Sequence, residues 1–348
     1  MNTDLSPEAV EYGRTARRAL QDAGGDELAA APAGLGGSAG QEGAHDAGDA
    51  AAKVLADLGA WDLDPRGSAE ELEAAAALCH SAGWWAVPHP VAERVARPRD
   101  VEADALLVVD ARTGDERTGD ERTGDVPSGY VPSGDARTGA IAEAVADGGL
   151  RWVAVDLDGG RYTAIPRPAE GPVGKPGHAR AVDLTPLAEA DGAAAVGDVA
   201  LGLVLPCWTL LGMLDRAVDL TAAYVNERQQ FGQPLASFQG VQFQLTDAEV
   251  ERVGVTELAK HALWSIASRQ PGTVDDALAL RLAAVEAAEV VFRITHQLHG
   301  AIGFCDETTL SWLSRASQPL RRLPLGPSAT RAALTARLGR RSLTGIYS

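Results

Sequence analysis

The sequence predicts a mainly α-helical protein with a small, mostly antiparallel β region in its middle. Long stretches with apolar residues at helical spacing fill the C-terminal half, and short runs rich in β-branched and aromatic residues precede them. The 348 residues are enough for two or three domains with real cores. We therefore expect helices over residues 1–100, the reduced β domain over 101–197 and a helical bundle over 198–348.

The first hundred residues predict short helices. Ser6, followed by a proline and a glutamate, is typical of a helix N-terminus, because its side chain can cap free N–H groups. Residues 24–49 are rich in Gly and Ala with almost no large apolar side chains, which predicts a loose loop. Helical spacing resumes over 50–58 and again over 68–80.

The β region contains runs bounded by Gly, Asp or Pro that predict short strands. They cover residues 105–109, 150–155, 161–165 and 180–184. Between them, residues 112–139 repeat Arg-Thr-Gly-Asp and then Val-Pro-Ser-Gly at a spacing of five. A solenoid unit needs about 20 residues or more, and this composition cannot bury enough apolar surface to offset its ordering entropy. The sequence predicts a disordered insertion over 112–139.

Long helices dominate from residue 198 onward. Helical periodicity covers 198–228, 238–268 and 273–299, with shorter helices expected near 308–317 and 328–342. Three long helices joined by short loops favour an antiparallel bundle.

Charge and cysteine content exclude several classes of function. The net charge of −17 argues against a nucleic-acid partner, because phosphate binding needs clustered Lys and Arg. Cys79, Cys207 and Cys305 are too widely spaced for a disulfide framework or a zinc site, so we expect reduced thiols in or near the core and no metal. We find no signal peptide and no apolar stretch of the roughly 20 residues that a membrane span needs. A cytoplasmic protein is expected.

Two blocks carry the chemistry. The first is Tyr224-x-x-x-Arg228-x-x-Phe231-Gly232 with Phe238-Gln239, and the second is Gln297-Leu-His-Gly300-Ala301-Ile-Gly303-Phe304. The arginine either completes a helix C-terminus or aims a planar guanidinium at a diphosphate. The glycine turn allows a backbone to approach a phosphate closely. His299 has no nucleophile near it in the sequence, so we do not assign it a catalytic role.

In this order the two blocks resemble the C-terminal helical domain of the acyl-CoA dehydrogenases, from about residue 198 to the end. The first hundred residues resemble the family loosely. The resemblance implies an N-terminal helical domain, a middle β domain and a C-terminal four-helix bundle. It also implies the flavin FAD, held across a subunit interface, and α,β-dehydrogenation (CH–CH oxidation) of a CoA thioester.

The resemblance further implies which residues meet the cofactor. Three positions would reach a flavin held mainly by a neighbouring subunit, and three match the turn that meets its adenosine diphosphate part. The first three are Arg228, Phe231 and Gln239, and the others are Gln297, Gly300 and Ala301. Ala301 replaces the second glycine of the family pattern.

Two departures from the family decide the functional prediction. Counting forward, Leu325 stands at the usual position of the catalytic glutamate, and Gly202 at the alternative position on the first bundle helix. Neither can accept a proton, so no catalytic residue is assigned. The Thr-Glu-x-x-x-Gly-Ser-Asp loop that holds the flavin ring in the family is also absent.

The sequence thus predicts the small, base-lacking subunit of a heteromeric acyl-CoA dehydrogenase, similar to those that oxidise steroid side chains in actinobacteria. A larger acyl-CoA dehydrogenase subunit would supply the base and most of the acyl-CoA pocket in an α2β2 assembly. Two alternatives stay open. One is a self-sufficient homo-oligomeric enzyme with a displaced base among Glu286, Glu289 and Glu307, and the other is a flavin-free helical scaffold.

Overall fold

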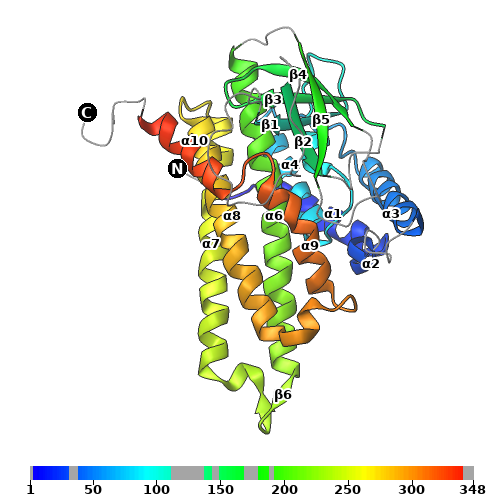
Figure 1. Ribbon diagram of the computed structural model, residues 1–348, viewed down its shortest axis with the longest axis vertical. Helices are drawn as coiled ribbons and strands as arrows, with labels where there is room; N and C mark the ends of the chain where they lie inside the picture. The colour runs from blue at the N-terminus through cyan, green and yellow to red at the C-terminus, as the bar shows by residue number, and fades with distance from the viewer. Residues whose placement is uncertain are drawn as a thin grey trace.

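The computed structural model describes residues 3–30, 38–110, 137–142, 149–167, 179–187 and 192–339. Long helices run side by side down the molecule, and a β-sheet and the N-terminal helices gather at one end of them (Figure 1). The expected fold class is confirmed: an N-terminal helical part, a small sheet in the middle and a C-terminal bundle.

In its described residues, the N-terminal part contains five helices. Their bounds are α1 Pro7–Asp22, α2 Asp26–Ala30, α3 Ser38–Asp57, α4 Ala69–Trp84 and α5 Val91–Val95. The Ser6 side chain accepts a hydrogen bond from the N–H of Ala9, which confirms the predicted cap. The loop predicted over 24–49 is wrong where the structure describes it, because α2 and the first part of α3 lie there; residues 31–37 lie outside the described ranges. Alanine has the highest helix propensity, and Leu55 anchors α3 in the core.

The sheet has five strands in the order β1-β3-β4-β5-β2. Their bounds are β1 Ala105–Val109, β2 Arg137–Ala142, β3 Trp152–Asp156, β4 Arg161–Pro166 and β5 Ala179–Pro186. Only the β1–β3 pair is parallel, so the mostly antiparallel prediction is confirmed. The insertion predicted over 112–139 is wrong at its end, since residues 137–139 begin β2; residues 111–136 lie outside the description.

The C-terminal part is the bundle. Its helices are α6 Gly192–Glu227, α7 Gln239–Ala267, α8 Thr273–His299, α9 Thr309–Arg322 and α10 Pro327–Gly339. A hairpin of β6 Gln229–Gln230 and β7 Gln233–Pro234, followed by the 3-10 turn η3 Leu235–Ser237, connects α6 to α7. The 3-10 turn η4 Gly300–Phe304 connects α8 to α9.

Helix α6 corrects the expectation that no segment reaches the length of a membrane span. Within the described ranges, Ala194–Glu227 is long and apolar enough to cross a membrane, but 78% of its most apolar window is buried inside the protein. It is the central helix of the core, packed on α4, α7, α8 and α9. The three cysteines are free thiols; Cys79 and Cys207 are buried, whereas Cys305 is exposed and is not part of the core.

Helices α4 and α6 cross at backbone contact. A Cβ atom on Gly83 would lie 1.8 Å from the carbonyl oxygen of Thr209, and one on Gly212 would lie 2.0 Å from that of His80. Only glycine fits at both positions, because real Cβ atoms do not approach oxygen this closely. The N-terminal helices are therefore pressed directly onto the bundle.

A buried carboxylate joins three parts of the chain. Asp198, on α6, is fully buried and accepts hydrogen bonds from Arg161 Nε on β4 at 2.9 Å and from Arg66 Nη2 at 2.5 Å. Arg66 precedes α4 and also donates to the carbonyl of Ala96 at 2.7 Å. Arg161 donates further to Asp100 at 2.6 Å. The charge of Asp198 is compensated as a buried charge requires.

Candidate functional site at the bundle end

The six predicted cofactor contacts lie at one end of the bundle, on the side away from the sheet (Figure 1). Arg228 directly follows α6, Gln239 is the first residue of α7, and Gln297 lies in the last turn of α8. Gly300 and Ala301 begin η4. The ends of α6 and α8 touch, because the ring of His299 stacks on that of Tyr224 at 4.4 Å. The two sequence blocks, about sixty residues apart, thus share one surface.

The α6–α7 hairpin presents Phe231 to solvent. Phe231 and Gly232 have φ values of 53° and 82°, which is the conformation that a two-residue hairpin turn requires at both central positions. Left-handed backbone is costly for an aromatic residue. The ring of Phe231 is 92% exposed and meets Phe238 edge-on at 6.1 Å. The backbone at Phe231 is therefore strained, and the strain holds the aromatic ring toward solvent. Strained backbone of this kind is common at binding sites.

Arg228 is exposed beside this hairpin. Its backbone is fixed, because its carbonyl accepts the N–H of Leu235 at 2.8 Å and its N–H donates to Tyr224 at 2.8 Å. Within the described ranges no carboxylate lies in ion-pair distance of its guanidinium. Gln239 and Gln297 are exposed as well. The guanidinium is thus available to an anion from outside this chain, for which its planar donors suit a diphosphate.

The turn after α8 depends on two glycines. Gly300 has φ 66° and ψ −146°, a combination that is nearly restricted to glycine. A Cβ on Gly303 would lie 2.9 Å from the Cβ of His299, so η4 packs tightly back onto α8. Around Gly300 the space is open. Ala301 is exposed at the same turn, so the backbone here is accessible to a ligand.

The two histidines at this end are packing residues. His299 Nδ1 donates to the carbonyl of Thr295 at 2.9 Å, and burial lowers the pKa of His299, which keeps the ring neutral. Burial also lowers the pKa of His296, which stacks on Phe304 at 4.3 Å. Neither histidine lies beside a serine or cysteine nucleophile in the hydrogen bonds of the described residues.

Both positions at which the family would place a base are buried. Leu325 is 3% exposed. Its carbonyl accepts a hydrogen bond at 2.8 Å from Arg281, a fully buried arginine that also donates to the carbonyls of Leu320 and Leu323. The segment that would carry the base is therefore tied into the core by its backbone.

Gly202, the second position, lies under the sheet. A Cβ there would come within 2.6 Å of Val108 Cγ2 on β1. One face of the sheet, with Leu106, Val108 and Val153, belongs to the same apolar cluster as α6. Sheet and helix are thus in direct contact at β1 and β3, which leaves no room for a flavin ring at these positions.

The three glutamates considered as substitutes for the catalytic base are either paired with an arginine or exposed to solvent. Glu286 on α8 forms an ion pair with Arg331 on α10. Glu289 and Glu307 are exposed to solvent. None of the three projects into a closed, water-poor pocket of the kind in which a carboxylate becomes an effective base.

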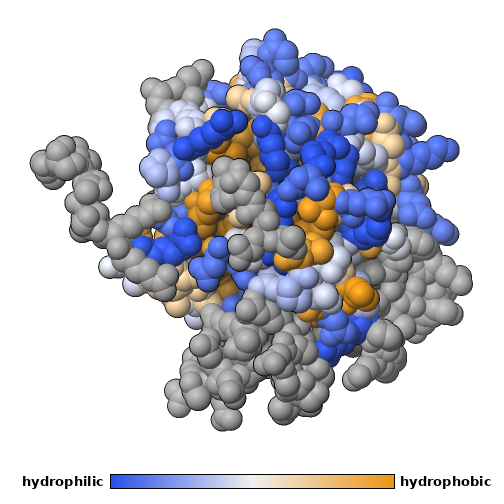
Figure 2. Space-filling model, turned by 90° about the horizontal axis from the view of Figure 1, so that it is seen from above, coloured by the Kyte–Doolittle hydropathy of each residue, from blue (hydrophilic) through white to orange (hydrophobic). Residues whose placement is uncertain are grey.

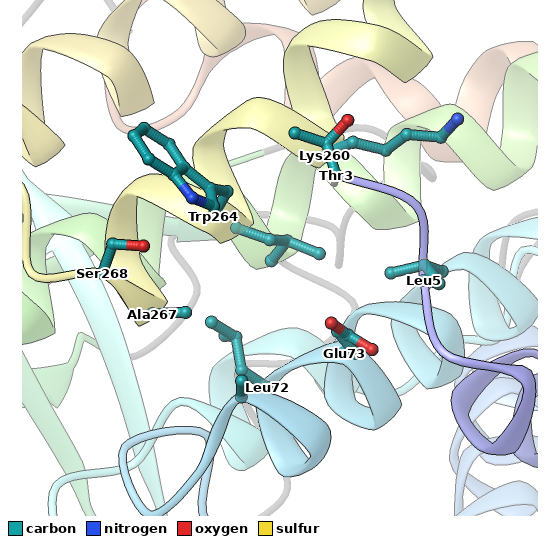
Figure 3. A pocket seen from close by; sticks show the side chains of 10 residues that line it. Thr3, Leu5, Leu72, Glu73, Lys260, Trp264, Ala267 and Ser268 are labelled. Carbon is teal, nitrogen blue, oxygen red and sulfur yellow. The ribbon is translucent and has the colours of Figure 1, made fainter. Parts of the chain in front are cut away.

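A cavity of about 300 Å³ lies at the other end of α7. Figure 3 shows it between the N-terminal segment, α4 and the last turns of α7, with Trp264, Leu72 and Leu5 around it. From Gln239 to Trp264 the helix rise of about 1.5 Å per residue gives about 38 Å. The cavity is therefore separate from the surface that carries Arg228. No cluster of His, Cys, Asp and Glu suitable for a metal occurs in the described residues.

Comparison with known proteins identifies a family similar to the C-terminal part of the chain. Residues 200–338 match the family model "Acyl-CoA dehydrogenase, C-terminal domain". This part of the chain is similar to the C-terminal domain of the acyl-CoA dehydrogenases. Among curated proteins, the chain is 31% identical over 105 residues to acryloyl-CoA reductase (NADH) of Anaerotignum propionicum, which is 30% of this chain and 26% of that protein. It is 32% identical over 117 residues to acyl-CoA dehydrogenase FadE28 of Mycobacterium tuberculosis, 34% of each. The matches thus span about a third or less of these relatives.

Solved acyl-CoA dehydrogenase structures share the whole fold. The ChsE4-ChsE5 complex from Mycobacterium tuberculosis superposes with a TM-score of 0.68 at 17% identity, over 98% of this chain and 100% of that one. The Tcur3481-Tcur3483 steroid ACAD variant gives 0.69 at 22%, over 96% and 98%. Butyryl-CoA dehydrogenase from Megasphaera elsdenii gives 0.66 at 16%, over 98% and 100%. At these identities the likeness shows the fold, including the sheet and N-terminal helices that the family model does not reach.

Sequence reasoning missed two features of this site. The role of Arg281 was not foreseen, because a lone arginine in a helix gives no signal of what it caps. The direct packing of the sheet on α6 was not predicted either, because the absence of the flavin-ring loop does not say what fills its place. Gly202 carried a usable signal, since a glycine inside a long apolar helix often marks a close approach.

Proposed function

We propose that this chain is one subunit of a heteromeric, FAD-dependent acyl-CoA dehydrogenase and contributes phosphate-side contacts to a flavin whose ring lies in a larger partner subunit. Bound FAD supplies the hydride acceptor for α,β-dehydrogenation of a CoA thioester. In the proposed assembly the partner supplies the base and the acyl pocket. This chain binds and orients the dinucleotide through Arg228, Gln239 and the turn at Gly300.

The observation that supports the proposal is that this chain offers groups for the phosphate side of a flavin but no space for its ring beside Gly202. At the bundle end, an unpaired guanidinium, exposed amides and an open glycine turn suit a dinucleotide. At Gly202, Val108 of β1 packs directly against α6, which leaves no space for a flavin ring at this position. A chain that binds only the phosphate side of a flavin can function in catalysis when a partner chain binds the flavin ring.

Exposed apolar side chains at the bundle end support a partner. Phe231 is 92% exposed, Phe304 68% and Ile302 46%. At the sheet end, Figure 2 shows hydrophilic residues with several hydrophobic groups between them. Large exposed apolar side chains gathered at one place mark interaction surfaces. Two structures with this fold are complexes of paired chains, ChsE4-ChsE5 and Tcur3481-Tcur3483. Because the second is described as a steroid ACAD, we propose a steroid side-chain thioester as the substrate of the assembly that contains this chain.

The direct experiment is co-expression with larger acyl-CoA dehydrogenase homologues from the same organism, isolation of the proposed α2β2 complex, and measurement of its FAD content by absorbance. Arg228→Ala removes a charge-assisted contact of about 1.5–3 kcal/mol, so FAD should dissociate roughly 10- to 150-fold more readily. Arg14→Ala, at an exposed pair with Glu11 on α1, is the matched control and should leave FAD content unchanged.

The same measurements separate the alternatives. A self-sufficient enzyme would be yellow and active as the chain alone, and would lose activity through Glu286→Gln or Glu307→Gln. A flavin-free scaffold would show the same cofactor content in its complexes with and without Arg228→Ala. Either result would replace the proposal. Dye reduction with straight-chain and steroid acyl-CoAs then identifies the substrate class.

A further inference from the structure

Helix α7 has an exposed face that is unusually apolar. Its buried residues, among them Ala248, Val255 and Ala259, define the side that faces α8 and α6. On the opposite side, four large apolar residues are exposed at spacings that keep them on one half of the helix. They are Phe243 at 60%, Val250 at 63%, Val253 at 43% and Leu258 at 38%. Gln239 lies on this side too, so the face is continuous with the proposed cofactor surface.

Carboxylates stand on the same face. Asp247 and Glu251 lie within one turn of Val250 and are exposed. Within the described ranges, neither takes part in an ion pair. The two cations of α7 are engaged by other carboxylates: Arg252 binds Asp215 at 3.0 Å and Glu249 at 2.6 Å, and Lys260 binds Asp4 and Glu257, both at 2.9 Å. The face therefore presents apolar side chains with uncompensated negative charge among them.

This combination disfavours pairing with a second copy. In a two-fold arrangement of two antiparallel α7 helices centred between Val250 and Glu251, Phe243 of one copy would face Leu258 of the other, which is favourable. The same arrangement places Asp247 and Glu251 of both copies within about 5 Å of the two-fold centre, measured along the helices. Like charges directly opposed in a desolvated contact are repulsive, and each copy has a net charge of −17.

We propose that the exposed face of α7, defined by Phe243, Asp247, Val250, Glu251 and Leu258, docks the matching helix of a homologous subunit that carries Lys or Arg opposite Asp247 and Glu251. The apolar residues supply the contact and the carboxylates select a non-identical partner over a second copy. The inference rests on the proposed function for the identity of the partner as a homologue. The selection by charge is a property of this chain alone.

That property can be tested without the natural partner, because a charge-reversed version of this chain is itself a homologue with basic residues at the right positions. Sedimentation velocity would compare the wild-type chain, the double variant Asp247→Lys/Glu251→Lys, and an equimolar mixture of the two. We expect the mixture to form 1:1 dimers at least tenfold tighter than the self-association of either protein, and to weaken as salt is raised.

Two controls locate the contact. Glu11→Lys/Asp22→Lys makes the same charge change on exposed positions of α1, and its mixture with the wild-type chain should gain nothing. Phe243→Ser in both proteins should abolish the hetero-association, whereas Ile165→Ser, which removes an equally exposed residue from the sheet, should leave it intact.

The inference is overturned if the wild-type chain self-associates as tightly as the mixture, if the α1 control mixture associates equally well, or if no mixture associates. None of these measurements involves flavin. If the mixture associates but FAD content never depends on Arg228, the docking face stands and the proposed function fails.

Discussion

At the scale of single residues, Arg281 is a buried guanidinium group that must be compensated inside the bundle. It is 1% exposed, forms no ion pair with a carboxylate in the described part of the chain, and donates to three carbonyls where α9 ends and the next segment begins. Burial lowers the pKa of this guanidinium. Carbonyls that lack N–H partners at a helix C-terminus need such donors. Arg281 therefore fixes the path of the chain through Leu325.

Replacing Arg281 by methionine keeps the volume and removes the donors. Leaving buried carbonyls unsatisfied costs about 1–3 kcal/mol each, so we expect a loss of about 3 kcal/mol or more in the free energy of unfolding, measured by urea denaturation. Arg331→Met is the matched control, because its ion pair with Glu286 is exposed and exposed pairs contribute about 0–1 kcal/mol. Equal effects of the two changes would contradict this role.

Glu93 on α5 predicts a pH dependence of stability. Burial raises its pKa from 4.5 to about 7. The folded protein thus holds this proton up to about pH 7, whereas the unfolded chain releases it near pH 4.5. The stability that the proton contributes is fully present below pH 4.5 and is lost as the pH rises through 7. Glu93→Gln stays neutral, so it should gain about 1–3 kcal/mol over the wild-type chain at pH 8 and nothing at pH 4. A difference that is constant over this range would refute the assignment.

At the scale of elements, the crossing of α4 and α6 depends on glycine. Gly212→Ala forces its Cβ toward a backbone carbonyl at 2.0 Å, and overpacking of this kind costs about 1–3 kcal/mol. Gly254 on α7 has nothing within 4 Å of a Cβ, so Gly254→Ala should be neutral or stabilise by up to about 1 kcal/mol through helix propensity. Thermal unfolding of both variants gives the comparison, and a stable Gly212→Ala protein would show that the helices can separate cheaply.

Elements with strong local signals were predictable, and those that depend on tertiary contacts were not. The three long helices and four strands follow apolar periodicity and β-branched composition, which are local properties. Helix α2 and the first part of α3 were missed because Gly/Ala-rich sequence is ambiguous until a neighbouring helix buries one face. Strand β2 was missed because its Arg-Thr-Gly-Ala start resembles the preceding repeats. Its register is set by β5.

At the scale of the whole molecule, the sequence predicted the part of the candidate site at the bundle end, but not the contact between the sheet and α6. The motifs around Arg228 and Gln297 are contiguous in sequence, so their positions at helix ends could be inferred, and both fall at the same end of the bundle. The contact of β1 with Gly202 joins segments almost one hundred residues apart, and no local pattern reports it. For the same reason the exposure of Phe243 and Val250 became visible only when the buried side of α7 was known.

The Asp198 cluster has a consequence for how this chain behaves in an assembly. One carboxylate holds guanidinium groups from β4 and from the segment before α4, so the sheet, the N-terminal helices and the bundle cannot pivot independently without stranding a charge in the interior. This buried ion cluster therefore disfavours hinge motion between the three parts. In the proposed assembly, we expect the motion that admits a substrate to take place in the partner subunit, while this chain stays rigid.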